Sequence, residues 1–178
     1  MRKVLGPSFF NRPTLAVARD LLGKYLVRKV RGKEIALLIT ETEGYHGTKD
    51  LACHARAGRT ARNDPMWGKP GHAYVYFTYG MHWMLNLVTG PDGFPSAVLI
   101  RALGDELNGP AKLTKFLQID KRLNTKPLAK TSGLWVEDRG VIVKRSEIQR
   151  GPRVGISYAG EYAHKPWRFM VKKKKSGN

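Results

Sequence analysis

The chain has 178 residues, of which 42% are hydrophobic, so it can bury the core of one domain and is too apolar to be intrinsically disordered. It carries 32 Lys and Arg against 14 Asp and Glu, and the net charge of +18 indicates a polyanionic partner, with nucleic acid favoured over an anionic membrane. The single cysteine excludes an internal disulfide and a clustered-cysteine zinc site, and the five histidines show no close metal-ligand spacing, so no metal is expected.

The first predicted elements are a helix and a hairpin. Residues 14–22 are predicted to form a helix, because an Asn-Arg-Pro sequence can open it and a glycine can end it. Residues 24–30 and 34–43 have strand composition, and the short Arg-Gly-Lys segment between them predicts that they pair.

The second of these strands ends in two acids. Alternate strand residues share a face, so we expect Ile35, Leu37, Ile39, Glu41 and Glu43 to lie on one side. A carboxylate at the mouth of a core can be partly desolvated, which raises its pKa and suits a general base. The alternative is that each acid simply pairs with an arginine of this basic protein.

A long loop follows over residues 44–72, with at most a short helical turn near residues 50–55. Loops of this length inside a compact domain are usually functional or disordered. This loop contains Tyr45, His54 and Trp67, so a functional loop is predicted.

Residues 73–88 predict a second hairpin with Tyr79 and a glycine at its turn, where asparagine or aspartate is more usual. An aromatic tip fits a wedge that enters a base stack, and Tyr45, His54 and Tyr76 could line a pocket for an extruded base. Ordinary strand packing of the tyrosines and a structural histidine are the alternatives.

The second half of the chain adds a strand and a helix. Residues 96–103 are a predicted strand that contains Arg101. Residues 110–117 follow an Asn-Gly-Pro opening and predict a helix whose apolar face contains Leu113, Phe116 and Leu117.

The last segments predict further strands. Residues 135–136 and 141–143 suggest a hairpin, and residues 153–157 and 167–171 suggest two more strands. Runs of strands with few helices predict an α+β protein with a mainly antiparallel sheet. We expect a single domain over residues 1–171 and a disordered basic tail over residues 172–178.

Several motifs follow one another along the chain: Glu41-Thr42-Glu43-Gly44-Tyr45, Lys69-Pro70-Gly71, Tyr74-Val75-Tyr76, Tyr79-Gly80-Met81, Val98-Leu99-Ile100-Arg101-Ala102-Leu103, Asn108-Gly109-Pro110-Ala111-Lys112-Leu113, Arg153-Val154-Gly155 and Ala159-Gly160-Glu161. Together they resemble the alkyladenine (3-methyladenine) DNA glycosylase family over nearly the whole chain. The resemblance implies one compact domain with a curved antiparallel sheet and a protruding β-hairpin that enters the DNA minor groove. It also implies that alkylated or deaminated purines, of the 3-methyladenine, 7-methylguanine, hypoxanthine and ethenoadenine class, are flipped out and excised to leave an abasic site, without a metal or other cofactor.

The resemblance assigns the catalytic roles position by position. Glu43 matches the general base, Arg101 matches an arginine that helps to hold the attacking water, and the main-chain carbonyl of Val154 matches a further water contact. This agrees with the chemistry, because loss of a purine builds oxocarbenium character that a nearby carboxylate stabilises.

The resemblance also assigns the base pocket. Tyr45, His54 and Tyr76 match walls that stack on the flipped base and bond to it, and Asn86 matches an amide that disfavours the exocyclic amine of guanine. The segments around residues 46–53 and 64–68 differ from the family pattern, which leaves the substrate range open.

The expected partner is double-stranded DNA that contains damaged purines. Tyr79 matches the intercalating tip with Met81 beside it, and Arg59 and Arg62 in the preceding loop are expected to contact phosphates or to remain solvated. We expect a cytoplasmic protein, because no signal peptide or apolar membrane span is present in the sequence. The chain resembles the compact bacterial members of the family, and we expect a monomer that is associated with the nucleoid through DNA binding.

Two alternatives have different activities. A non-catalytic nucleic-acid-binding module would explain the charge and the aromatics but leaves Glu43 and Arg101 without a purpose. A glycosylase with lyase activity would use a lysine Schiff base, and the chain is rich in lysine. Release of free base tests the first alternative, and borohydride trapping tests the second.

Overall fold

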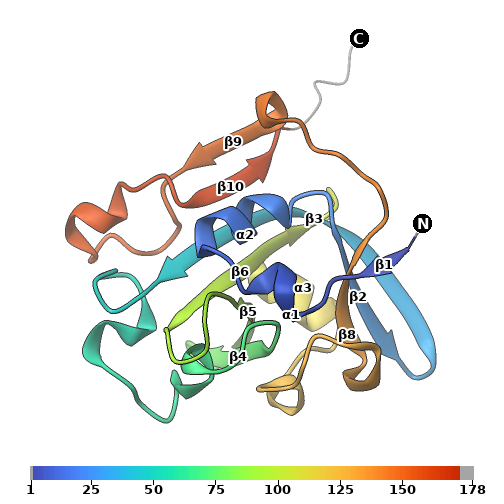
Figure 1. Cartoon of the computed structure of the whole chain (residues 1–178), viewed down its shortest axis with the longest axis horizontal. Coiled ribbons are helices and arrows are strands. Elements are labelled where there is room, and N and C mark those ends of the chain that lie inside the picture. Colours follow the sequence, from blue (N-terminus) through green and yellow to red (C-terminus); the bar gives the residue numbers. More distant parts are fainter. Residues whose placement is uncertain (1, 173–178) are drawn as a thin grey trace.

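One antiparallel sheet dominates the computed structural model, which describes residues 2–172 (Figure 1). The strands are β1 (Lys3–Val4), β2 (Tyr25–Val30), β3 (Lys33–His46), β4 (Ala73–Thr78), β5 (His82–Val88), β6 (Ser96–Leu103), β7 (Leu107–Asn108), β8 (Leu134–Asp138), β9 (Ile148–Gly151) and β10 (Arg168–Val171). The α-helices are α1 (Pro7–Phe10), α2 (Thr14–Asp20) and α3 (Pro110–Phe116). The main path across the sheet is β1-β8-β2-β3-β6-β5-β4, while β7 pairs with β6, and β10 pairs with β3 and β9. The predicted α+β class is confirmed.

The long strand β3 lies at the centre of the sheet. Its first half pairs with β2 through a turn in which Arg31 and Gly32 both have positive φ, at 49° and 83°. Positive φ at both central residues is the geometry of a two-residue hairpin turn whose twist matches that of its strands. The second half of β3 lies between β6 and β10. The predicted first hairpin is therefore confirmed.

Two register shifts beside Glu41 interrupt the pairing of β3 with β6. Such irregularities bend a strand and re-aim its side chains. Ile39 is fully buried in the main core and the Thr42 hydroxyl donates to a carbonyl of α2, whereas Glu41 and Glu43 both contact Arg101. The prediction that the apolar residues and the acids share one face is therefore wrong, because the irregularity breaks the alternation.

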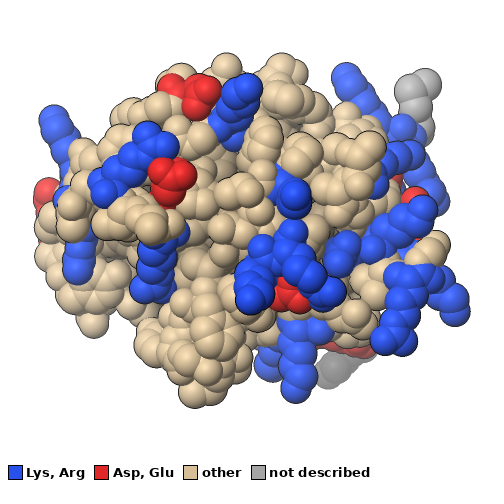
Figure 2. Space-filling view, turned by 90° about the horizontal axis from the view of Figure 1, so that it is seen from below, with Lys and Arg blue, Asp and Glu red and all other residues tan. Residues whose placement is uncertain are grey.

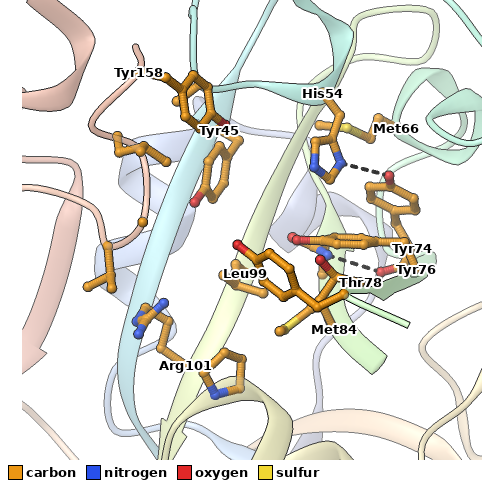
Figure 3. Close-up of a pocket in the computed structure, with 17 residues that line it drawn as sticks. Tyr45, His54, Met66, Tyr74, Tyr76, Thr78, Met84, Leu99, Arg101 and Tyr158 are labelled. Atoms are coloured by element: carbon orange, nitrogen blue, oxygen red, sulfur yellow. Dashed lines mark hydrogen bonds between the residues drawn. The ribbon is translucent and has the colours of Figure 1, made fainter. Parts of the chain in front are cut away.

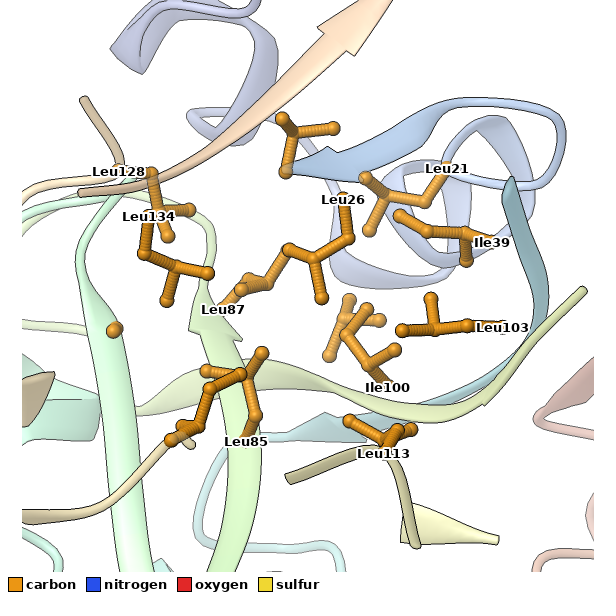
Figure 4. Packing of buried hydrophobic residues seen from close by; sticks show 14 of the residues in the cluster. Leu21, Leu26, Ile39, Leu85, Leu87, Ile100, Leu103, Leu113, Leu128 and Leu134 are labelled. Atoms are coloured by element: carbon orange, nitrogen blue, oxygen red, sulfur yellow. The ribbon is translucent and has the colours of Figure 1, made fainter. Parts of the chain in front are cut away.

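The main core and the acids lie on opposite faces of the sheet. On β6, Val98 and Ile100 enter the core, while Leu99 and Arg101 line a cavity on the other face. The core unites side chains from α2, α3 and the central strands (Figure 4). Its largest fully buried members include Leu21, Leu26, Ile39, Leu85, Leu87, Ile100, Leu103 and Leu113. Burying each such side chain contributes about 1.5–3 kcal/mol.

Helix α2 packs tightly against β3 at Gly44. A Cβ on Gly44 would lie only 2.6 Å from Leu15 Cδ2, so a larger residue would force the Leu15 side chain to move. Strand neighbours point to the opposite face, so this close contact directs Glu43 and Tyr45 away from α2.

Helix α3 buries a narrower face than the sequence predicts. Leu113 and Leu117 are fully buried, but Phe116 is 53% exposed, so its assignment to the apolar face is wrong. The helix ends at this residue and packs chiefly on β5 and β6.

Two predicted strand features near the C-terminal end are wrong. The hairpin of residues 135–136 and 141–143 does not form, because β8 pairs with β1 and β2 from the start of the chain. Residues 153–157 form turns, and the strand of this region is the earlier β9. The final predicted strand, β10, is confirmed.

The long loop begins later than predicted, because β3 continues through His46. It contains two 3₁₀ helices, η1 (His54–Ala57) and η2 (Asp64–Trp67), where only one short turn is predicted. Residues 173–178 of the predicted basic tail lie outside the described residues. No helix within residues 2–172 is both long and apolar enough to cross a membrane.

Candidate active site

A cavity of about 280 Å³ opens beside the second half of β3, close to the lower end of the usual size range of ligand pockets. Strands β3 to β6 supply several walls, and the loop after β3 and the turns after β9 supply others (Figure 3). Its lining includes Tyr45, His54, Met66, Tyr74, Tyr76, Tyr79, Met84, Asn86, Leu99, Arg101, Val154 and Tyr158. Most of the site residues predicted from the sequence therefore meet at one cavity.

Glu43 lies directly behind the cavity wall and is fully buried. Its Oε1 accepts the Val154 main-chain N–H at 2.7 Å and lies 3.5 Å from Arg101 Nε, and its Oε2 accepts the Tyr45 hydroxyl at 2.9 Å. Burial raises the pKa of this carboxyl, although Arg101, the Val154 N–H and the Tyr45 hydroxyl partly oppose the rise. The result is a desolvated, oriented carboxyl group whose three partners all line the cavity.

Arg101 bridges the two acids of β3. Its Nε lies closer to Glu41 Oε1, at 3.0 Å, than to Glu43 Oε1. Glu41 also accepts Arg168 Nη1 at 3.3 Å. Pairing with arginine, the alternative explanation for both acids, therefore describes Glu41 well and Glu43 only in part.

A buried ion pair holds the turn that contains Val154. The Arg153 guanidinium donates to Asp50 Oδ2 at 2.6 Å and Oδ1 at 2.7 Å, and both side chains are 0% exposed. Arg153 also donates to the Gly44 carbonyl at 2.9 Å and lies 4.6 Å from the centroid of the Tyr45 ring. The pair therefore joins the long loop, β3 and the turn that supplies the N–H to Glu43. The sequence predictions concern the carbonyl of Val154, whereas the observed contact is through its N–H.

Aromatic side chains form the walls of the cavity. Tyr45 extends from β3 and Tyr76 from β4 toward the same space (Figure 3). Burial raises the pKa of Tyr76 to about 12 and that of Tyr45 well above its usual value, so both hydroxyls remain protonated at neutral pH. These rings offer flat apolar faces with neutral polar tips, which suits a planar ring.

His54 lies against this aromatic wall. Its Nδ1 is 2.9 Å from the Tyr74 hydroxyl, and its ring packs edge-on to Tyr76 at 4.6 Å between centroids. Burial lowers the pKa of His54 to about 4, and Arg62 and a second arginine nearby add to this effect, so the imidazole is neutral at pH 7. Asn86 is buried, and its Nδ2 donates to the Tyr74 carbonyl at 3.3 Å.

The β4–β5 hairpin presents its tip at the rim of the cavity. Strands β4 and β5 pair from Ala73 opposite Leu87 to Thr78 opposite His82. Tyr79 and Gly80 lie in the turn, with φ of 51° and 67°. Tyr79 is 81% exposed, and Met81 beside it is 65% exposed. A bulky residue at positive φ is strained, and burial in the core does not compensate that strain, because Tyr79 is exposed.

The surface is strongly basic. Lys and Arg side chains far exceed acidic ones on the face that Figure 2 shows. Arg62 donates to the Phe77 carbonyl of the hairpin at 3.3 Å and lies 5.3 Å from the Tyr76 ring centroid. Arg59 pairs with Asp64 at 2.7 Å, and both of these side chains are more than half exposed. Of the two predicted phosphate contacts, Arg62 is therefore nearer to the cavity and Arg59 is partly neutralised.

Sequence reasoning missed three residues that organise the cavity. Asp50 and Arg153 are far apart in the chain, and only an acid and a base in two separate loops hinted at their pairing. Tyr74 was expected to pack within its strand, yet its hydroxyl reaches His54. Within residues 2–172, no group of three or more His, Cys, Asp or Glu side chains is arranged to hold a metal ion.

Comparison with known proteins finds relatives that match most of the chain. A family model described as methylpurine-DNA glycosylase matches residues 8–106 and 103–175. A protein of Methanocella arvoryzae, named as a candidate 3-methyladenine DNA glycosylase, is 49% identical over 95% of this chain and 92% of its own. Proteins with the same name from Anaeromyxobacter dehalogenans and Streptomyces avermitilis are 44% and 43% identical, over 94% and 96% of this chain and 83% and 88% of their own.

Proposed function

The chain belongs to the methylpurine-DNA glycosylase family, and we propose on this basis that it flips damaged purines out of duplex DNA and hydrolyses their N-glycosidic bond with water activated by Glu43. Its activity class is that of a DNA-3-methyladenine glycosylase, a hydrolase of N-glycosyl bonds. The substrates proposed are alkylated and deaminated purines, including 3-methyladenine, 7-methylguanine, hypoxanthine and ethenoadenine.

Extrusion of the nucleotide is the role proposed for the hairpin. A base inside a duplex must leave the stack before it can reach a pocket, and unstacking costs a few kcal/mol. Tyr79 is exposed at a strained tip next to the cavity, and it would fill the gap in the stack. Met81 would contact the same groove, which we propose to be the minor groove.

The extruded base would stack against the aromatic walls. Tyr45 and Tyr76 supply planar faces, and stacking tolerates many bases because every base has a π-face. Asn86 would disfavour guanine, because its amide would clash with the exocyclic amine of that base. A broad range of accepted purines, with a few excluded bases, follows from these two features.

Hydrolysis would use Glu43 as general base. The water oxygen forms a bond to C1′ as the C1′–N bond breaks, the bonding pair leaves with the purine, and the water proton passes to Glu43. Arg101 and Val154 line the cavity and contact the Glu43 carboxylate, so they would orient a water bound next to that carboxylate. The negative charge of Glu43 would also stabilise the oxocarbenium character of the sugar. A raised carboxyl pKa brings the base closer to working pH.

Binding to DNA would rely on charge. The net charge of +18 favours phosphate contacts that release counterions, without regard to sequence. We propose Arg62 as one such contact, because it adjoins the hairpin carbonyl of Phe77. We also propose that the protein acts as a monomer, since one chain supplies both the cavity and the Glu43 carboxylate behind its wall.

The observation that carries the proposal is the buried Glu43 carboxylate, which is held by three groups of an aromatic, base-sized cavity. A duplex with one hypoxanthine tests it. The expected result is release of free base, with the strand intact until alkali cleaves the abasic site, and no adduct trapped by borohydride. A trapped adduct would favour the lyase alternative. Tight lesion binding without base release would favour a binding module.

A further inference from the structure

A second cavity, of about 410 Å³, lies on the face of the sheet opposite to Glu43. Its walls come from α2, the 3₁₀ helix η5 (Arg145–Glu147), β9 and β10, and Figure 1 shows α2 next to β9 and β10. On β10, Arg168 contacts Glu41, so its neighbour Phe169 points to the other face, where it joins the main core and lines this cavity. We call this cavity the α2 pocket.

Three arginines from three elements line the α2 pocket. Arg19 extends from α2, Arg145 from η5 and Arg150 from β9. The Arg150 guanidinium lies 5.2 Å from the Phe169 ring centroid, and its Nε donates to the Pro166 carbonyl at 3.3 Å. Among the described residues Phe169 is the only aromatic ring of the lining. Because Arg150 covers that ring, the pocket presents cations to a ligand and no open face on which a base could stack.

Acidic side chains neutralise little of this charge. Asp20 lies 2.8 Å from Arg19 Nε, but it also pairs with Arg12 at 3.1 Å, so one carboxylate serves two arginines. Neither Arg145 nor Arg150 forms an ion pair with an acid in the part of the chain that the structure describes. The pocket therefore has a net positive charge.

The surroundings of Arg145 add to this charge. Glu147 follows two residues later, but its carboxylate accepts the main-chain N–H of Lys144 at 2.8 Å. The Lys172 ammonium donates to the Ser146 carbonyl at 2.7 Å, which places a further cation beside η5. The edge of the α2 pocket is thus basic as well as its walls.

Guanidinium groups that converge without carboxylates suit phosphate, which accepts paired hydrogen bonds from arginine. Arg145 and Arg150 are exposed and come from different elements, so their reach fits a chain of phosphates along a backbone. A nucleic-acid backbone offers such a chain, and it needs no stacking surface. A duplex at the Glu43 cavity does not reach this pocket, because the sheet lies between the two.

We propose that the α2 pocket binds the backbone phosphates of a second nucleic-acid segment, so that one protein molecule holds two duplexes on opposite faces of its sheet. Binding there is independent of sequence, since only phosphates are contacted. The second site goes beyond the proposed function and needs no chemistry at Glu43.

Sedimentation velocity with an excess of a short undamaged duplex tests the proposal. Non-specific sites have dissociation constants of about 10⁻⁴–10⁻⁶ M, so duplex at about 10⁻⁴ M should fill both faces. The expected wild-type complex contains one protein and two duplexes. Combining Arg19→Gln, Arg145→Gln and Arg150→Gln should reduce it to one protein and one duplex.

The matched control loses the same charge from the β2–β3 hairpin, which lines neither cavity, through Lys29→Gln, Arg31→Gln and Lys33→Gln. It should still bind two duplexes. The proposal is overturned if the wild type binds one duplex, if the α2-pocket variant still binds two, or if the control loses the second duplex equally. Wild-type protein that binds phosphatidylglycerol vesicles but no second duplex would also overturn it and assign the pocket to a membrane.

Excision separates this proposal from the proposed function. At saturating enzyme, the α2-pocket variant should release hypoxanthine from a duplex at the wild-type single-turnover rate, because its substitutions lie on the other face of the sheet. A large loss of rate in the variant would show that the pocket serves the catalytic face and would overturn the second site. Absence of excision by the wild type refutes the proposed function instead, and the sedimentation result does not depend on it.

Discussion

Replacing Arg153 by methionine should destabilise the protein by about 3–5 kcal/mol, the usual cost of leaving one member of a buried ion pair alone. The structure supports the upper part of this range. Both side chains of the Arg153–Asp50 pair are 0% exposed, and the variant leaves the Asp50 carboxylate with only the N–H groups of His46 and Ala52. The free energy of unfolding of a native protein is about 5–15 kcal/mol in total, so this loss would be a large share of it.

Urea denaturation at pH 7, extrapolated linearly, measures this loss. The matched control is Arg122→Met, which breaks an Asp120 pair whose arginine side chain is 75% exposed, and it should cost at most about 1 kcal/mol. Adding Asp50→Asn to Arg153→Met removes the buried charge and should recover part of the loss. A cost below about 1 kcal/mol for Arg153→Met, or no recovery in the double variant, would refute the reasoning.

Three further predictions address the hairpin, the charges and the histidine. Tyr79→Ser should reduce excision from duplex far more than from a single strand, because only the duplex has a gap in its stack to fill; equal losses in both, with an unchanged circular dichroism spectrum, would mean that Tyr79 is no wedge. Arg62→Ala should lower the salt dependence of DNA binding by a log–log slope of about 0.9 per lost phosphate contact, and Arg59→Ala should lower it less because Asp64 already pairs with that arginine; a larger change for Arg59→Ala would reverse the assignment. The pKa of His54 falls from 6.5 to about 4 on folding, so the folded state binds fewer protons between these values and stability should fall by up to about 3 kcal/mol as the pH drops through that window. His54→Gln should flatten this dependence in urea denaturation, and an unchanged slope would contradict the assigned burial.

Secondary-structure elements that depend only on neighbouring residues could be predicted from the sequence. The Arg31-Gly32 and Tyr79-Gly80 turns close hairpins between neighbouring strands, and both glycines supply positive φ. The predicted hairpin around residues 135–143 failed because the partners of β8 come from the start of the chain, which a local pattern does not reveal. Gly155, with φ of 74°, was the available sign that residues 153–157 turn.

Residues of the candidate site could be predicted only where their position within a single strand or turn indicates their role. Glu43 follows from its place near the end of an apolar strand, although the register shifts that turn it away from Ile39 have no clear sequence signal. The Asp50–Arg153 pair and the bond from Tyr74 to His54 depend on how separate segments pack. Residue composition alone does not specify such contacts.

Single-turnover excision by Glu43→Gln, beside Glu41→Gln, tests most directly whether Glu43 activates the water. The account predicts that Glu43→Gln loses about 10²–10⁴ in rate and keeps its affinity for lesion DNA, because only the proton acceptor is removed. Glu41→Gln, which loosens an ion pair with Arg101, should keep most of the activity. Normal excision by Glu43→Gln with an inactive Glu41→Gln would show that the other acid is the base.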